Sequence, residues 1–272
     1  MEKINKISAI IIAKNASSEI IPALVSLHFC DEIILVDNGS VDNTIEIAKK
    51  YNARVVKSFS NNFASWRNEG AKAARGDWLL YVDTDERVSN RLANEIKRVI
   101  KNKDYSAYTI PRYEIFLGKH LEHWGDSYVL RLIKTEKLKK WQGKLHEQPQ
   151  IIGDIGSLKN QLLHLSHKNI DEKTLNTLEW SKAEAKMLFE SGHPPMVWWR
   201  FLRVMFTEFW QRAVKHGLWK DGIEGWIEII YQMFSVFITY VRLWELQRKP
   251  SLRETYNQID KDFLENLKSN QN

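Results

Sequence analysis

Apolar and helix-like segments alternate through the first hundred residues. Continuous apolar runs, typical of buried strands, lie at 7–13, 32–36, 54–57 and 78–82. Helical patterns occur at 18–27, 43–51, 63–74 and 91–100, and Ser89 is placed to cap the last of these. Continuous apolar strands separated by helices predict an α/β fold with a doubly wound, mostly parallel sheet covered on both faces. In such sheets, ligands bind beside the carboxyl ends of the strands.

The pattern changes in the middle of the chain. Short strand-like pieces at 105–111, 128–133 and 161–165 stand among Gly, Pro, His and Trp residues, which indicates an irregular extension of the sheet with long loops. From Asp171 onward the pattern is almost entirely helical, with breaks at 193–195 and 217–225. We therefore expect two parts, a sheet-containing domain over 1–168 and a helical region over 169–272.

The helical region carries broad apolar faces. Between 223 and 245 the polar side chains recur every three or four residues and so form one narrow stripe on a helix. This polar stripe consists of Glu224, Glu228, Gln232, Ser235, Thr239, Arg242 and Glu245. Helices rich in Trp and Phe with flanking basic residues are typical of the membrane interface, so we expect peripheral or monotopic membrane contact. Core or dimer packing is the alternative, and acidic Glu228 within the apolar stretch disfavours a true span.

Composition narrows the classes of partner. The 272-residue chain carries a net charge of +6, which favours a phosphorylated substrate, a membrane surface or nucleic acid. Nucleic acid is the weakest of these, because the basic residues accompany apolar faces and no recognised binding module is present. The single cysteine, Cys30, excludes a disulfide framework and a thiolate-rich metal site. The run 7–13 leads into Lys14 without a cleavage site, so we expect a first strand and a protein on the cytoplasmic face of the plasma membrane.

Carboxylates gather where two of the predicted strands end. Strand 32–36 leads into Asp37 and Asp42, and strand 78–82 leads into Asp83 and Asp85. Oxygen ligands at a sheet edge suggest a Mg²⁺ or Mn²⁺ site, because these ions are usually held by one or two carboxylates and substrate phosphates. The alternative is that these residues only cap turns and helices. A dinucleotide fingerprint and a P-loop are both absent, so metal and basic side chains must hold any phosphate.

A set of ordered motifs resembles a known family. The segments 10–15 (IIIAKN), 34–44 (ILVDNGSVDNT), 67–68 (RN), 76–78 (GDW) and 83–86 (DTDE) are similar to those of family-2 glycosyltransferases with the GT-A fold. The later segments 143–147 (GKLHE) and 163–164 (LH) resemble a narrower branch, which contains the bacterial lipopolysaccharide-core β-glucosyltransferases and related cell-envelope enzymes. The resemblance covers roughly residues 5 to 170.

The resemblance implies a role for each matching residue. It implies that Ala13 and Asn15 line the nucleobase, that Asp37 holds the nucleobase, and that Arg67 packs near it. It also implies that Asp83 contacts the ribose or the metal, that Asp85 binds the metal, and that His164 is a further metal ligand. Glu147 is implied to be the catalytic base. Two positions depart from the pattern. Ala16 stands where relatives commonly carry Glu, and Val41 stands where Thr is usual, so the details of nucleotide contact differ from those of the relatives.

The chemistry of glycosyl transfer suits these residue types. A divalent ion neutralises the leaving diphosphate, and a general base activates the acceptor hydroxyl. Glu147 qualifies as the base, with His146 orienting it or serving itself. The alternative readings are a surface loop pair for these two residues and a core histidine for His164.

We therefore predict an inverting, metal-dependent enzyme. It would transfer a hexose, glucose foremost, from a nucleoside-diphosphate sugar such as a UDP-sugar to a lipid-linked or lipopolysaccharide-type acceptor. Two alternatives stay open. One is a membrane-bound nucleotide-sugar-binding scaffold without turnover. The other is a Mg²⁺-dependent aspartyl phosphatase, for which Arg87 is an unusual residue two positions after the second aspartate.

Overall fold

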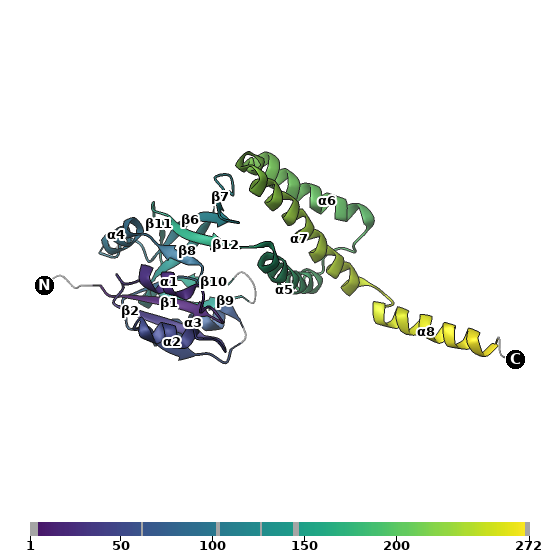
Figure 1. The fold of residues 1–272 in the computed structure, drawn as a ribbon, viewed down its shortest axis with the longest axis horizontal. Coiled ribbons are helices and arrows are strands. Elements are labelled where there is room, and N and C mark those ends of the chain that lie inside the picture. Colours follow the sequence, from purple (N-terminus) through teal and green to yellow (C-terminus); the bar gives the residue numbers. More distant parts are fainter. Residues whose placement is uncertain (1–4, 61, 102–103, 126, 144–146, 270–272) are drawn as a thin grey trace. The chain divides into compact units, whose positions relative to one another are not determined.

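The computed structural model describes residues 5–60, 62–101, 104–125, 127–143 and 147–269. The chain divides into two compact units (Figure 1). The sheet-containing unit, called the catalytic unit because the predicted site residues lie in it, contains residues 1–120 and 124–168. The helical unit contains residues 121–123 and 169–272. Each unit is described by itself.

The catalytic unit begins with the alternation that the sequence predicts. Its first elements are β1 (Ile7–Ala13), α1 (Ile20–Ser26), β2 (Glu32–Asp37), α2 (Thr44–Lys50), β3 (Arg54–Lys57), α3 (Phe63–Ala73), β4 (Trp78–Tyr81), β5 (Glu86–Val88) and α4 (Asn90–Val99). The four predicted strands and four predicted helices are confirmed, with ends that differ by at most two residues. Ser89 caps α4 by accepting a hydrogen bond from the N–H of Leu92 (3.2 Å).

The second half of this unit extends the sheet. It contributes β6 (Ala107–Phe116), β7 (Lys119–His120), β8 (Tyr128–Lys134), β9 (Leu138–Gln142), β10 (Gln148–Ile151), β11 (Ile155–Ser157) and β12 (Leu162–Ser166). The main sheet has the order β3-β2-β1-β4-β8-β6-β12-β5. Strands β1 to β4 pair in parallel, β8 is antiparallel to both its neighbours, and β12 runs parallel to β6. The predicted α/β fold is confirmed, with a parallel half and a mixed half.

Strands β5, β7, β9, β10 and β11 were not expected from the sequence. They contain two to five residues each. Runs this short carry too little periodicity to distinguish them from loops, so pairing with neighbouring strands decides their structure.

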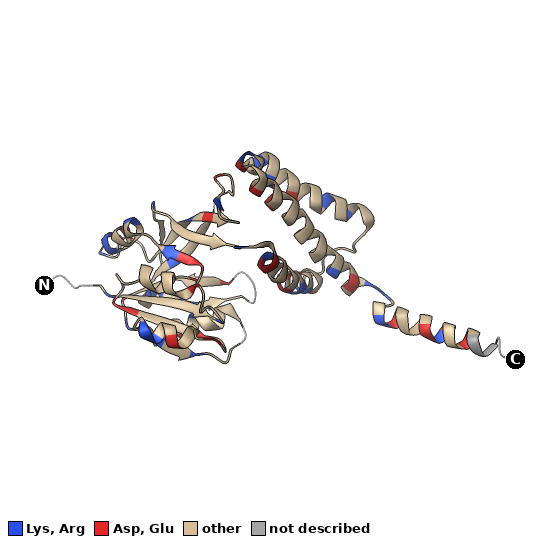
Figure 2. Cartoon of the chain, in the orientation of Figure 1, with Lys and Arg blue, Asp and Glu red and all other residues tan. Residues whose placement is uncertain are grey.

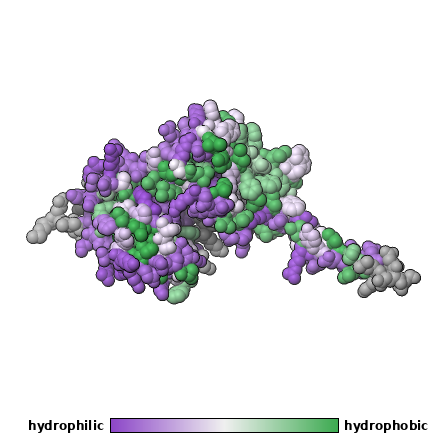
Figure 3. Space-filling view, viewed as in Figure 1, coloured by the Kyte–Doolittle hydropathy of each residue, from purple (hydrophilic) through white to green (hydrophobic). Residues whose placement is uncertain are grey.

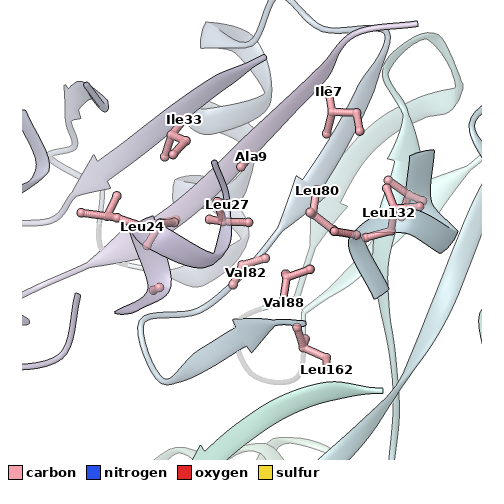
Figure 4. Close-up of a cluster of buried hydrophobic side chains, with 14 of the residues drawn as sticks. Ile7, Ala9, Leu24, Leu27, Ile33, Leu80, Val82, Val88, Leu132 and Leu162 are labelled. Carbon is pink, nitrogen blue, oxygen red and sulfur yellow. The ribbon is translucent and has the colours of Figure 1, made fainter. Parts of the chain in front are cut away.

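Both faces of the parallel half are buried. On one face Leu24 of α1 and the following Leu27 belong to a buried cluster that also contains side chains of β1, β4 and β12 (Figure 4). On the other face α3 packs against β1 through Gly70. A Cβ atom at Gly70 would lie 2.4 Å from Cγ2 of Ile10, so only glycine permits this close approach. Because β1 pairs in parallel with β2 and β4, the carboxyl ends of all three strands meet at one edge.

The helical unit is confirmed as nearly all helix. It contains α5 (Ile170–Glu190), α6 (Trp198–Phe209), a π-helical segment (Trp210–His216), a short 3₁₀ turn (Leu218–Asp221), α7 (Ile223–Gln247) and α8 (Leu252–Ser269). Gly222, with φ 78° and ψ −148°, occupies a conformation reserved for glycine just before α7. Among the residues described, no helix is both long enough and apolar enough to cross a membrane.

Two members of the polar stripe of α7, Glu228 and Thr239, are buried in the interior of this unit. Glu228 is fully buried, and its carboxylate lies 2.5 Å from Nζ of Lys173 on α5. Farther along α7, Thr239 donates to Glu184 (3.2 Å) and Arg242 donates to the carbonyl oxygen of Leu178 (2.6 Å), both on α5. The interior of the unit therefore contains a row of hydrogen bonds and ion pairs between α5 and α7.

The opposite sides of α6 and α7 expose large apolar side chains. Residues 229–241 carry no charge, and Figure 2 shows the middle of α7 almost without charged residues. Exposed side chains follow one side of each helix, and hydrophobic residues spread over this region in Figure 3. This apolar surface comprises Trp198, Trp199, Leu202, Phe206 and Trp210 together with Ile223, Trp226, Ile230, Phe234 and Trp244.

Candidate active site

A turn anchored by a buried glutamate follows β4. Glu86 is fully buried, and one carboxylate oxygen accepts the backbone N–H of Asp83 (2.9 Å). Its other oxygen accepts from Arg112 (2.5 and 3.0 Å) and Arg131 (3.1 Å), which come from β6 and β8. A buried carboxylate needs such partners, because an unpaired charge in the interior is very costly. Glu86 therefore fixes the backbone of the segment that carries both candidate aspartates.

Asp83 lies among three arginines. Nη2 of Arg67 is 3.3 Å from Oδ1, Nη2 of Arg112 is 3.9 Å from Oδ2, and Arg131 donates to the same Oδ2. Burial raises the pKa of Asp83, but the charges of Arg131, Arg67 and Arg112 outweigh it and hold the pKa below its usual range. Asp83 is therefore an ionised carboxylate whose oxygens already have cationic partners.

Asp85, His164 and Glu114 form a linear array on three neighbouring segments. Nε2 of His164 on β12 lies 3.3 Å from Oδ2 of Asp85, and its Nδ1 lies 2.5 Å from Oε2 of Glu114 on β6. Burial lowers the pKa of His164, but hydrogen bonds with Asp85 and Glu114 outweigh it and raise the pKa to about 9. Without a metal, the imidazole is thus a cation held between two carboxylates.

Glu147 is joined to Asp83 through Arg67. Nε of Arg67 donates to Oε1 of Glu147 (2.8 Å), while the same guanidinium reaches Asp83. The Arg67 side chain is buried on α3, with its charge 4.9 Å from the ring of Trp141. Asn68, the next residue, binds the backbone of Trp141 through its carbonyl oxygen and its NH₂ group (2.8 and 2.9 Å). The Arg67-Asn68 pair therefore ties α3 to the segment that leads to Glu147.

The loops after β1 and β2 hold one another at the same edge. Asn15 has a left-handed backbone (φ 51°), and its side chain accepts the N–H of Val41 (2.8 Å). Asp37 is nearly buried and closes its own turn by accepting the N–H groups of Gly39 and Ser40 (both 3.2 Å). The ends of both strands are thus pre-arranged beside the β4 turn.

The structure places most of the predicted residues in the catalytic unit. Arg67 joins Asp83 to Glu147, and His164 pairs with Asp85, which stands two residues after Asp83 on the same turn. Ala13, Asn15 and Asp37 lie at the ends of the adjacent strands β1 and β2, where Ala13 is buried. The second candidate base, His146, lies outside the described residues.

Sequence reasoning missed the roles of Glu86, Arg112, Glu114 and Arg131. Two signals were available. Arg131 interrupts an otherwise apolar strand, and Arg112 and Glu114 stand two residues apart in β6, so they point to the same face. A charged residue inside an apolar strand requires a buried partner. The partners themselves depend on strand order, which these signals do not contain.

The donor set fits a hard divalent cation held partly by substrate. Among the residues described, no group of three or more His, Cys, Asp and Glu side chains is arranged around a common point for a metal. Asp85 and His164 nevertheless offer one carboxylate and one imidazole side by side, and the arginines occupy Asp83. Two protein ligands completed by diphosphate oxygens suit Mg²⁺ or Mn²⁺.

The chain is similar to one family model and to several known proteins. The model of glycosyl transferase family 2 matches residues 8–156, which is more than half of the chain and includes Asp83, Asp85 and Glu147. The lipopolysaccharide core biosynthesis glycosyltransferase LpsC of Rhizobium meliloti is 26% identical over 262 residues, which cover 90% of this chain and 96% of LpsC. An uncharacterized glycosyltransferase of Rickettsia typhi is 26% identical over 267 residues, covering 90% of this chain and 88% of that protein.

Solved structures give more distant likenesses. S. aureus TarS in complex with UDP-GlcNAc is 20% identical, with a TM-score of 0.46 and coverage of 60% of this chain and 59% of that one. M. tuberculosis glucosyl-3-phosphoglycerate synthase in complex with Mn²⁺, UDP and phosphoglyceric acid is 17% identical, with a TM-score of 0.44 and coverage of 70% and 80%.

Proposed function

Because the chain belongs to glycosyl transferase family 2, we propose that it is an inverting, metal-dependent hexosyltransferase. In this proposal a nucleoside-diphosphate sugar, with a UDP-sugar foremost and glucose as the hexose, donates to a lipid-linked or lipopolysaccharide-type acceptor. Family membership makes the chain a glycosyltransferase and not an aspartyl phosphatase. The observation that carries the proposal is that the turn after β4 holds both Asp83 and Asp85. Arg67 joins Asp83 to the proposed base Glu147, and His164 pairs with Asp85.

The donor would lie along the edge formed by β1, β2 and β4. Asn15 and Asp37 stand at the nucleobase end, Asp83 at the ribose, and Asp85 with His164 at the diphosphate. When bound there, the divalent ion would act as a Lewis acid that neutralises the charge of the leaving diphosphate. The arginines beside Asp83 keep that carboxylate ionised, so it is always ready to accept hydrogen bonds from sugar hydroxyls.

Glu147 would take the proton from the acceptor hydroxyl. As the acceptor oxygen forms a bond to the anomeric carbon, the bond from that carbon to the diphosphate oxygen breaks, and the hydroxyl proton moves to the Glu147 carboxylate. Attack opposite the leaving group inverts the anomeric centre. Arg67 holds the carboxylate by one oxygen, so the side chain is oriented before the acceptor arrives.

The apolar surface of the helical unit supports a membrane-bound acceptor. Trp198 is 75% exposed and Ile230 is 62% exposed, although large exposed apolar patches are rare on monomers in water. Cationic side chains stand over several of the aromatic rings: Arg200 over Trp199 (5.1 Å), Lys220 over Trp219 (5.8 Å) and Arg248 over Trp244 (4.9 Å). Aromatic rings beside basic residues suit the headgroup region of an anionic membrane. The similarity to LpsC points to the same kind of acceptor.

The donor half of the proposal is tested by calorimetry with UDP, GDP, ADP and the corresponding sugars, with and without Mn²⁺. We expect tight binding of one nucleotide only when Mn²⁺ is present. Equal binding with and without Mn²⁺ would contradict the metal dependence, and binding of phosphomonoesters alone would contradict the donor class.

The acceptor half is tested by flotation of the full-length protein with vesicles. We expect it to float with anionic vesicles, to be released only in part by high salt, and to transfer sugar to a lipid-linked core oligosaccharide embedded in them. A protein that ignores these vesicles and stays monodisperse without detergent would show that the apolar surface serves packing instead.

A further inference from the structure

We propose that Glu114 is the positioning residue that prepares His164 for the divalent cation, an inference that rests on the proposed function. Glu114 lies behind the histidine, on the side away from Asp85. In this role it touches neither the donor sugar nor the acceptor, and it acts only through the imidazole.

Strand register brings the two side chains together. Strands β6 and β12 are parallel, and Glu114 is the direct partner of His164 in that register. Neighbouring residues in register point to the same face of a sheet. Oε2 of Glu114 lies 2.5 Å from Nδ1 of His164, so the contact follows from the fold and not from a flexible loop.

A carboxylate at Nδ1 determines what the other ring nitrogen offers. Glu114 is an acceptor, so Nδ1 must carry the hydrogen. The remaining nitrogen, Nε2, faces Asp85 at 3.3 Å and becomes the lone-pair donor when the cation replaces its proton. Histidines that bind metals commonly donate their other N–H to a carboxylate, which fixes the ring and makes the ligand more basic.

The surroundings of Glu114 distinguish it from a carboxylate that only supports the backbone. It is 4% exposed, and its oxygens accept from the side chains of His164 and Ser127 (2.8 Å). Glu95, an equally buried glutamate in the same unit, instead accepts the backbone N–H groups of Lys159 and Asn160 (3.0 and 2.8 Å). Glu114 is thus paired with the candidate ligand, and Glu95 provides a matched control.

The test replaces Glu114 by Gln in the full-length chain and measures Mn²⁺ affinity by EPR at saturating UDP. The amide weakens the bond to Nδ1–H and can also donate to Nδ1, which selects the wrong tautomer. We expect Mn²⁺ to bind roughly 10- to 100-fold more weakly. UDP binding without metal should stay unchanged. The Mn²⁺ concentration for half-maximal turnover should rise, while kcat at saturating Mn²⁺ changes by only a few-fold.

Two further variants separate positioning from stability. Glu95→Gln removes a buried charge of the same kind and should leave Mn²⁺ affinity unchanged. In a His164→Ala background, Glu114→Gln should change Mn²⁺ affinity by less than about twofold, because residues that act through one another are not additive.

Other results would contradict either the metal-dependent function or the role of Glu114. If the wild-type chain binds no Mn²⁺ with UDP, the metal-dependent function fails and this inference fails with it. If the wild type binds Mn²⁺ and Glu114→Gln binds it equally well, only the role of Glu114 is overturned. Equal losses from Glu114→Gln with and without His164 would show that Glu114 serves the fold alone.

Discussion

The two units place their apolar and charged residues in opposite ways. In the catalytic unit, β1 buries all seven of its residues, and the charged clusters stand at the edge where substrate would bind. In the helical unit, α6 has no buried residue, while α7 buries Glu228 and Thr239 and exposes Trp226 and Ile230. The catalytic unit is thus arranged for water around it. The helical unit has the arrangement that the proposed membrane contact would require.

The polar interior of the helical unit provides the strongest test of this contrast. Replacing Lys173 by Met removes the nearer of two cations from the fully buried Glu228 and leaves Arg212 at 3.9 Å, which should destabilise the unit by about 3 kcal/mol. Replacing both residues together, as Lys173→Met with Glu228→Leu, should restore most of this loss. Thermal unfolding of the full-length chain in detergent, followed by circular dichroism, measures both. Equal stability of the wild type and Lys173→Met would mean that the interior does not depend on the pair.

Removing a carboxylate from the proposed metal site should slow turnover and leave the stability of the catalytic unit almost unchanged. Asp85→Ala removes the proposed carboxylate ligand, and loss of Lewis-acid stabilisation worth several kcal/mol corresponds to roughly 10²- to 10³-fold slower transfer. The melting temperature should barely change. Asp154→Ala, at an exposed aspartate of the same unit, should leave transfer unchanged. Normal Mn²⁺-dependent UDP binding by Asp85→Ala would remove this residue from the metal site.

A further variant separates the proposed base role of Glu147 from the proposed ligand roles of Asp85 and His164. Glu147→Gln keeps an acceptor for Arg67 but cannot take a proton, so kcat should fall by roughly 10²-fold or more. Affinity for the UDP-sugar, measured by calorimetry, should change little. Turnover close to that of the wild type would place the base elsewhere.

The exposed face of α7 allows a smaller but cleaner perturbation. Replacing Trp226, Ile230 and Phe234 by Ser should weaken flotation with anionic vesicles without altering UDP binding or thermal stability, because these side chains point outward. Phe237 packs against Phe201 with ring centroids 5.8 Å apart, so Phe237→Ser is a control that should destabilise the helical unit instead. Unchanged flotation of the triple variant would indicate that another surface contacts the vesicles.

The smallest expected effect concerns acid stability. Burial raises the pKa of Glu95, but backbone hydrogen bonds from Asn160 and Lys159 outweigh it and hold the pKa below its usual value. Its contribution is complete above the unfolded pKa near 4.5 and is lost as pH falls through the lower folded value. Glu95→Gln should therefore be less stable by about 1 kcal/mol near neutral pH, and the two proteins should converge in acid. A difference in melting temperature between the two proteins that stays constant down to about pH 2 would contradict this assignment.

Local patterns in the sequence predicted some of these features and not others. Apolar runs located β1 to β4, and the carboxylates after β2 and β4 lie at one sheet edge, as the predicted parallel pairing requires. Spacing also predicted the polar stripe on α7. Which side of that helix faces inward could not be predicted, because periodicity defines a stripe but not its partner.

Local patterns also could not predict which distant residues meet in the site. Glu114 and His164 are 50 residues apart, and only the pairing of β6 with β12 makes them neighbours. Arg131 likewise meets Asp83 across the β4–β8 side of the sheet, 48 residues away. Register between distant strands depends on the whole sheet, so no local motif contains it.

Gly70 has a consequence for how catalytic rate can vary among related chains. It lies one helical turn after Arg67 on α3, the helix that carries the guanidinium bound to Glu147. A methyl group at position 70 would lift the helix away from Ile10 and carry Arg67 with it. Substitutions at position 70 are therefore expected to change the transfer rate, although this residue touches no ligand. We expect Gly70→Ala to transfer sugar more slowly than the wild type while its donor affinity stays equal, and a comparison of the two transfer rates tests this.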